Sequence, residues 1–325
     1  MGRVCATLVG LALALLLATS AAGDPLGVPI PDSSGPTPPW PQLLPPMPVP
    51  TDVQPGPVAR CSDPTLACVD GTLSIMRSLR AQFGCDHRAV FDTTYLLLTE
   101  VFRKTMVDEP HFFQDNRYLI WEDTLFANYY FRTLSRYAAG ESVPAAWKIA
   151  LDAAHSGDAD AAQDMLLGIN AHVQRDMPYV VASLGMRFRD GASRKPDHDA
   201  VNEILRRAYE PIVHEIAARY DSFVSLSNSS ATPADNIGGL EAVKGWREGV
   251  WRNAERLMNA RTDAERAQVS ASIEQNAALW ARAILSFQNP PGHRAERDAY
   301  CRAHAPSSAS AQRSATRSRN SHRRK

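Results

Sequence analysis

Apolar side chains recur every three or four residues through most of the chain between residues 71 and 287. This spacing places them on one face of an α-helix, whereas the strict alternation typical of a half-buried strand is rare here. Glycine and proline residues divide the region into separate segments of helical period. We therefore predict an all-α fold, a single bundle-like domain of about eight helices. The predicted helices span residues 71–83, 87–107, 115–138, 144–155, 159–186, 197–221, 239–260 and 263–287.

The segment 87–107 carries two apolar stripes instead of one. Val90 and Leu97 belong to the first stripe, and Phe91 and Tyr95 belong to the second. A helix that is apolar on two sides must be covered on two sides. We therefore expect this helix to lie at the centre of the bundle.

The first 22 residues have the features of a signal peptide. Arg3 precedes an apolar run from Leu8 to Ala18, and small residues follow that run. The run is shorter than the roughly 20 apolar residues that cross a bilayer comfortably, and no second long apolar stretch follows it. We therefore expect cleavage near Ala22 and a protein that is secreted or associated with the cell envelope, without a transmembrane segment.

Two polar segments flank the helical domain, which we place at residues 60–305. Residues 23–59 contain thirteen prolines, a composition typical of an extended linker. Residues 306–325 contain six lysines and arginines and no acidic residue, as in disordered basic tails. The formal net charge of zero therefore hides an acidic domain joined to a basic tail. We expect the tail to contact anionic lipid or a cell-envelope polymer, and nucleic acid is the least expected partner of an exported protein.

Four cysteines remain after Cys5 leaves with the signal peptide. An even number in an oxidising compartment predicts two disulfides, and three pairings exist. We favour a local bridge from Cys61 to Cys68 and a long bridge from Cys85 to Cys301 that joins the two ends of the domain. Zinc bound by four thiolates is the alternative, but the chain has no Cys-x-x-Cys pair.

Polar residues within apolar stripes are the best candidates for a site, because burying them without a partner costs free energy. In the segment 159–186, His172 and Asp176 lie one turn apart on the apolar face. At this spacing, both side chains can bind one metal ion, or the carboxylate can orient the imidazole as a base. Pro178 should kink the helix beside them. The alternative is that the two residues only satisfy each other.

In two further segments, polar residues likewise lie within an apolar stripe. Asp123 lies on the apolar face of the segment 115–138, where tyrosine hydroxyls could satisfy it. His198, Asp199 and Asn202 open the segment 197–221, where an aspartate could instead cap the helix. We expect the interrupted stripes to converge on one polar pocket.

Familiar catalytic motifs are missing from the sequence. His214 and Glu215 begin a zinc-protease pattern, but Ala218 occupies the position of its second histidine. The chain also lacks a Gly-x-Ser-x-Gly elbow, a phosphate loop and a dinucleotide fingerprint.

The stretch Gly-Ile-Asn-Ala-His-Val-Gln-Arg-Asp-Met-Pro at residues 168–178 resembles a motif of an uncharacterised family of secreted, helical proteins common in actinobacteria. The resemblance covers roughly residues 75–225 and implies no established activity. A remoter similarity links the His-x-x-x-Asp helix to zinc-dependent phospholipases C and single-strand nucleases, which are exported helical enzymes. That similarity implies a divalent metal such as zinc. Those enzymes use more histidines and an amino-terminal tryptophan, so it implies one or two ions here instead of three.

The leading hypothesis from the sequence is a metal-assisted hydrolase of a phosphoester or envelope component. His172, Asp176 and His198 would bind the metal, and Asp123 or Asp199 would complete its shell or act as the base. Asn170 and Asn202 would orient substrate oxygens. The competing hypothesis is a noncatalytic protein that binds or organises the cell envelope.

Overall fold

Helices and the turns between them make up the part of the chain that the computed structural model describes, residues 60–224 and 233–304. Within these ranges no residue lies in a β-strand, and an isolated β-bridge joins Arg187 to Ser193. The predicted all-α fold is therefore confirmed. The predicted signal peptide, linker and basic tail lie outside the described residues.

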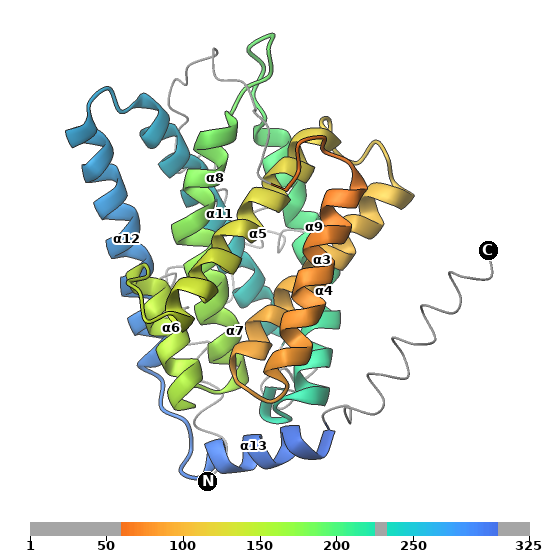
Figure 1. Cartoon of the computed structure of the whole chain (residues 1–325), viewed down its shortest axis with the longest axis vertical. Coiled ribbons are helices and arrows are strands. Elements are labelled where there is room, and N and C mark those ends of the chain that lie inside the picture. Colours follow the sequence, from red (N-terminus) through yellow and green to blue (C-terminus); the bar gives the residue numbers. More distant parts are fainter. Residues whose placement is uncertain (1–59, 225–232, 305–325) are drawn as a thin grey trace, which may run out of the picture.

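The helices pack side by side with α4 and α5 near the middle of the bundle (Figure 1). Their bounds are α3 Leu66–Phe83, α4 Arg88–Asp108, α5 Asn116–Ala138, α6 Ala145–Ser156, α7 Ala161–Ile169, η1 Asn170–Asp176, α8 Met177–Leu184, α9 Lys195–Arg219, α11 Pro233–Asn259, α12 Asp263–Leu285 and α13 His293–His304. As expected, α4 is a central helix, since α3, α7 and α9 all pack against it. Within the described ranges, every helix is too short or too polar to cross a membrane.

The predicted helix over residues 159–186 is in fact three consecutive elements. Between α7 and α8 the chain widens into the π-helix η1, in which the Met177 N–H donates to the His172 carbonyl five residues earlier. The cause follows directly in the sequence. Pro178 has no N–H and its ring would clash with the carbonyl four residues before it, and a wider turn avoids that clash.

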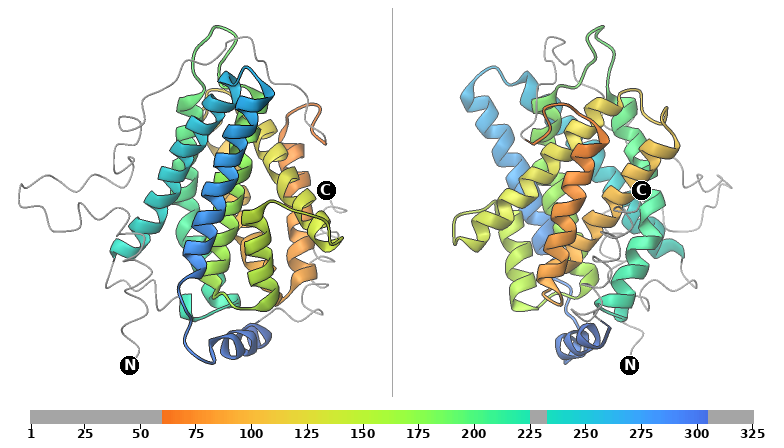
Figure 2. Two further views of the ribbon diagram at one scale, coloured as in Figure 1. Left: turned by 90° about the vertical axis from the view of Figure 1, so that its left-hand side faces the viewer. Right: turned by 45° about the vertical axis from the view of Figure 1, so that its right-hand side comes forward.

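Helix α13 was not predicted, and it lies across one end of the bundle (Figures 1 and 2). Both predicted disulfides are confirmed, and the bridge from Cys85 to Cys301 ties α13 to the start of α4. The His87 ring and the Asp298 carboxylate, 2.9 Å apart, form a second link between these two elements.

Most of the core is apolar and aromatic. Leu73, Leu96, Leu119, Tyr130 and Trp147 are among its largest enclosed side chains. Burial of such side chains is the main favourable contribution to folding. The ionisable groups that are buried with this core therefore need partners.

Candidate functional site

His172 and Asp176 form a buried pair on η1, as their spacing predicts. The His172 Nδ1 lies 3.1 Å from the Asp176 Oδ2, and the two residues are 2% and 0% exposed. The Trp147 Nε1 donates to the same Asp176 oxygen at 2.8 Å, and the Arg175 Nη1 donates to the other oxygen at 2.9 Å. Because a carboxylate only accepts, we assign the His172 proton to Nδ1 and the lone pair to Nε2.

Aromatic rings enclose His172 on several sides. Its ring stacks on Phe126 with the centroids 3.4 Å apart, and Tyr95 lies edge-on at 4.8 Å. Phe91 and Trp147 complete the enclosure at 5.9 and 5.8 Å. Burial lowers the pKa of His172, with Asp176 opposing this shift, so the imidazole is held in its neutral form.

Asp123 faces the same interior region from α5. Burial, followed by the nearby Glu122 charge, raises the pKa of Asp123 to about 7. The Tyr95 hydroxyl is also enclosed, and its pKa is raised well above the usual value, chiefly by burial and then by the charges of Asp123 and Asp176. Asp123, Tyr95 and the pair on η1 therefore belong to one electrostatic neighbourhood.

Asn170 links η1 to α12. Its side-chain amide donates to the Ala277 carbonyl at 2.9 Å, and its oxygen accepts from the Gln174 amide at 2.7 Å. Both oxygen and amide are engaged in these contacts. The predicted role of Asn170 in orienting substrate stays a prediction.

Of the residues predicted at the start of α9, His198 and Asn202 contact α11, and Asp199 contacts Lys195 of its own helix. The His198 Nε2 lies 3.1 Å from the Arg247 carbonyl, and the Asn202 oxygen accepts from the Arg247 Nε at 2.9 Å. Asp199 is half-exposed and pairs with Lys195 at 2.7 Å. Burial, followed by the Arg247 charge, holds the pKa of His198 well below its usual value.

The described side chains include no group of three His, Cys, Asp or Glu residues that could hold a metal ion. A cavity of about 20 Å³ borders Phe91, Tyr130 and Trp147, beside the His172 enclosure. This is room for about one water molecule. Metal binding by His172, Asp176 and His198 stays a prediction, and so do the catalytic roles of Asp123 and Asp199 and the substrate contact of Asn202.

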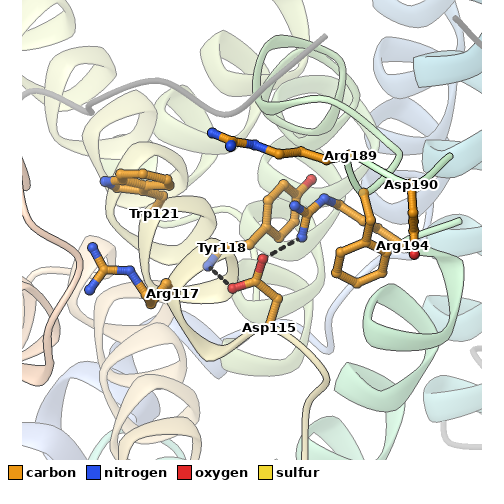
Figure 3. Close-up of a pocket in the computed structure, with 8 residues that line it drawn as sticks. Asp115, Arg117, Tyr118, Trp121, Arg189, Asp190 and Arg194 are labelled. Carbon is orange, nitrogen blue, oxygen red and sulfur yellow. Dashed lines mark hydrogen bonds and ion pairs between the residues drawn. The ribbon is translucent and has the colours of Figure 1, made fainter. Parts of the chain in front are cut away.

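A larger and open pocket of about 490 Å³ lies between the first turns of α5 and the α8–α9 loop, residues 185–194 (Figure 3). This volume falls within the roughly 300–1,000 Å³ typical of ligand sites. We call it the arginine pocket, because three guanidinium groups, two carboxylates and three aromatic rings line it. The lining residues are Asp115, Arg117, Tyr118, Trp121, Phe188, Arg189, Asp190 and Arg194.

Arg194 joins the two walls of the arginine pocket. Its Nη1 donates to the Asp115 Oδ2 at 2.8 Å, and its Nε donates to the Arg187 carbonyl at 3.2 Å. The guanidinium carbon lies 4.1 Å from the centre of the Tyr118 ring and 4.2 Å from that of Phe188. Arg194 is only 5% exposed. It therefore fixes the shape of the pocket through ion pairing and cation–π contact.

Backbone contacts hold both walls as well. The Asp197 carboxylate accepts from the backbone N–H groups of Gln114 and Asp115 at 2.7 and 2.9 Å, which ties the start of α5 to α9. Across the loop, Arg187 and Ser193 form the isolated β-bridge. Contacts within the protein thus hold both walls of the pocket in place.

The remaining charged groups lie at the opening. In Figure 3, the Arg189 side chain extends over the pocket toward the side occupied by Trp121. Arg189 is exposed and has no ion-pair partner among the described residues. Arg117 pairs with Asp63 at 2.9 Å, and their side chains are 61% and 72% exposed. Such an exposed pair contributes little stability, so a ligand can replace Asp63 at low cost.

Reasoning from the sequence missed the arginine pocket. The predicted site residues are polar groups on apolar stripes, whereas this pocket lies at the start of α5 and in the loop after α8. Tyr118 and Trp121, three residues apart beside Arg117, were a usable signal. The contribution of Arg194 depends on contacts that the local sequence does not reveal.

A family model described as "Family of unknown function (DUF5995)" matches residues 69–287. The matched region contains η1 and every residue of the arginine pocket, and it ends before α13. Neither the curated proteins nor the solved structures gave a significant match.

Proposed function

Since the chain belongs to the DUF5995 family, whose function is unknown, we propose its function from the arginine pocket: noncatalytic binding of an anionic cell-envelope ligand. The supporting observation is a pocket of ligand size with three guanidinium groups in its lining, of which that of Arg189 has no ion-pair partner among the described residues. A guanidinium fork pairs with carboxylate or phosphate oxygens in two parallel hydrogen bonds. An anion would therefore supply the partner that Arg189 lacks, and it could replace Asp63 on Arg117.

The rigid walls favour binding further. Arg194 and Asp197 hold the loop and the start of α5 together through contacts within the protein. A ligand then binds without the free-energy cost of ordering the loop.

The region around His172 gives less support to hydrolysis. His172 and Asp176 are 2% and 0% exposed, and the neighbouring cavity holds about one water molecule. A metal-assisted hydrolase needs an open coordination position and space for its substrate beside the ion. The proposed binding function does not depend on a metal at His172.

We place this binding at the cell envelope. Two disulfides are typical of an oxidising compartment. The predicted signal peptide would export the chain, and the linker of residues 23–59 would act as a spacer. The basic tail of residues 306–325 would add a second contact, with anionic lipid or an envelope polymer.

Titration calorimetry of the full mature chain with two small anions tests the proposal. The probes are trigalacturonate, which carries carboxylates, and tripolyphosphate, which carries phosphates. We expect at least one of them to bind, with an affinity that falls as salt is added. Arg189→Ala should weaken that binding about tenfold, which corresponds to about 1.4 kcal/mol.

Arg77→Ala is the matched control. Arg77 is an exposed arginine of α3 outside the pocket, where it pairs with Glu100 at 2.7 Å. This variant loses the same charge and keeps the basic tail, so its affinity should stay within twofold of the wild type. Equal weakening in both variants, or no binding of either anion, would contradict the proposal.

A further inference from the structure

Trp121 provides a fixed aromatic platform in the arginine pocket. Its indole Nε1 donates to the Cys61 carbonyl at 2.9 Å, and Cys61 is held by the disulfide to Cys68. Arg194 already lies over one face of the Tyr118 ring and one face of the Phe188 ring. The Trp121 ring is therefore the aromatic surface of the pocket that we assign to a ligand, and it suits the apolar face of another ring.

One carboxylate restricts which anion can enter. Asp190 accepts one hydrogen bond, from the Ala192 N–H at 2.9 Å, and its Oδ2 has no partner among the described residues. Asp115, on the opposite wall, is already paired with Arg194 at 2.8 Å. An anion without hydrogen-bond donors is repelled by the Asp190 carboxylate, whereas a ligand that also carries hydroxyl groups can donate to it.

The guanidinium groups lie beside this platform. Figure 3 shows Arg117 on the same side of the pocket as Trp121, with Arg189 reaching toward them from the loop. A planar carboxylate on a ring stacked on Trp121 would therefore meet a guanidinium fork.

We infer that the ligand of the arginine pocket is an acidic sugar, with its ring on Trp121, its carboxylate on Arg189 and Arg117, and its hydroxyls on Asp190. This inference rests on the proposed anion-binding function and names the chemical class of the anion. An apolar ring face, a negative charge and several hydroxyl donors are combined in a uronic acid. Tripolyphosphate has the charge alone.

Calorimetry on the full mature chain compares three probes: trigalacturonate, its fully methyl-esterified form and tripolyphosphate. We expect esterification, which removes the charge and keeps the rings, to weaken binding at least tenfold. Trp121→Ala should weaken trigalacturonate binding at least tenfold and change tripolyphosphate binding less than twofold. Asp190→Asn should weaken trigalacturonate binding about threefold and strengthen tripolyphosphate binding, because it removes a negative charge.

A further variant separates binding from folding. Trp121→Phe keeps a ring but loses the hydrogen bond to Cys61, so trigalacturonate binding should stay within about threefold of the wild type. Circular dichroism checks that each variant is folded. If Trp121→Ala and Asp190→Asn change the affinities for both anions alike, the acidic-sugar inference is wrong and anion binding stands. If neither anion binds, both proposals are wrong.

Discussion

Asp92 has no exposed surface, and its Oδ1 accepts one long hydrogen bond, from the Tyr130 hydroxyl at 3.5 Å. Burial raises its pKa to about 8, and the Arg80 charge opposes this only in part. Burial likewise raises the pKa of Glu122 and of Asp164 to about 7. These carboxyls hold protons more tightly in the folded protein than in the unfolded chain. The stability they contribute is therefore complete below pH 4 and is lost as the pH rises through 7 to 8.

Asp92→Asn should remove the part of the pH dependence of stability that comes from Asp92. Asparagine resembles the protonated aspartic acid, so the free energy of unfolding should change little at pH 4 and below, where both states of the wild type hold the proton. At pH 9 the wild type carries a buried charge that the variant lacks, and the variant should be more stable by on the order of 3 kcal/mol. Urea unfolding at both pH values measures this. An equal effect at the two pH values would show that Asp92 does not titrate in this range.

His172→Ala should destabilise the protein by about 3 kcal/mol, because it opens a cavity among aromatic rings and removes a partner of the buried Asp176. Asp199→Ala is the matched control, since Asp199 is half-exposed and its loss should cost less than about 1 kcal/mol. Urea unfolding gives both values. A stoichiometric metal that is present in the wild type and lost in His172→Ala would instead support the metal site predicted from the sequence.

Gly168 allows α7 and α4 to pack closely against each other. It lies in α7 where α7 packs on α4, and a β-carbon at this position would overlap the Phe91 ring. Phe91 in turn contacts the His172 ring. The glycine thus allows α4 to reach the aromatic enclosure on η1.

Gly168→Ala should cost about 1–3 kcal/mol, since Phe91 would have to leave its position. The control is Gly249→Ala in α11, where nothing lies within 4 Å of the added carbon. There the substitution should stabilise the protein by up to about 1 kcal/mol, because alanine favours helix. Thermal unfolding of both variants gives the comparison. Effects of the same sign would contradict the conclusion that Gly168 is needed for the packing of α7 on α4.

Local sequence signals predicted the long helices well and the irregular elements poorly. The apolar period of α4 and α5 repeats over several turns, so their ends fall within one residue of the prediction. The sequence of α13 is short and highly charged, and its apolar stripe is too sparse to recognise. Pro178 correctly indicated a distortion next to His172, but a proline in a helix does not by itself distinguish a kink from a π-helical turn.

The long disulfide acts on the whole molecule. Cys85 and Cys301 are 216 residues apart, whereas Cys61 and Cys68 are 7 apart. In the chain-entropy account, the bridge that closes the longer loop restricts the unfolded chain more.

Replacing both Cys85 and Cys301 by serine should therefore cost about 2–5 kcal/mol. Hydrogen exchange should show α13 losing protection before the other helices. Replacing Cys61 and Cys68 in the same way should cost less, and calorimetric unfolding compares the two. A larger loss from the short bridge would contradict the entropic account.

The sequence predicted one part of the candidate site and not the other. His172 and Asp176 share a helix, so their pairing follows from a spacing of four residues. The predicted convergence with His198 stays a prediction, because it depends on how α9 turns relative to η1. That orientation is set by contacts such as the one between Asn202 and Arg247, which no local spacing encodes.

The bridge from Cys85 to Cys301 also determines how the domain bears mechanical load. A pull on the chain beyond residue 304 is transmitted from Cys301 directly to Cys85, at the start of the central helix α4. The covalent bond bypasses α12 and α11, so these helices are not peeled away one after another. If an envelope polymer anchors residues 306–325, the domain resists that tension at its core.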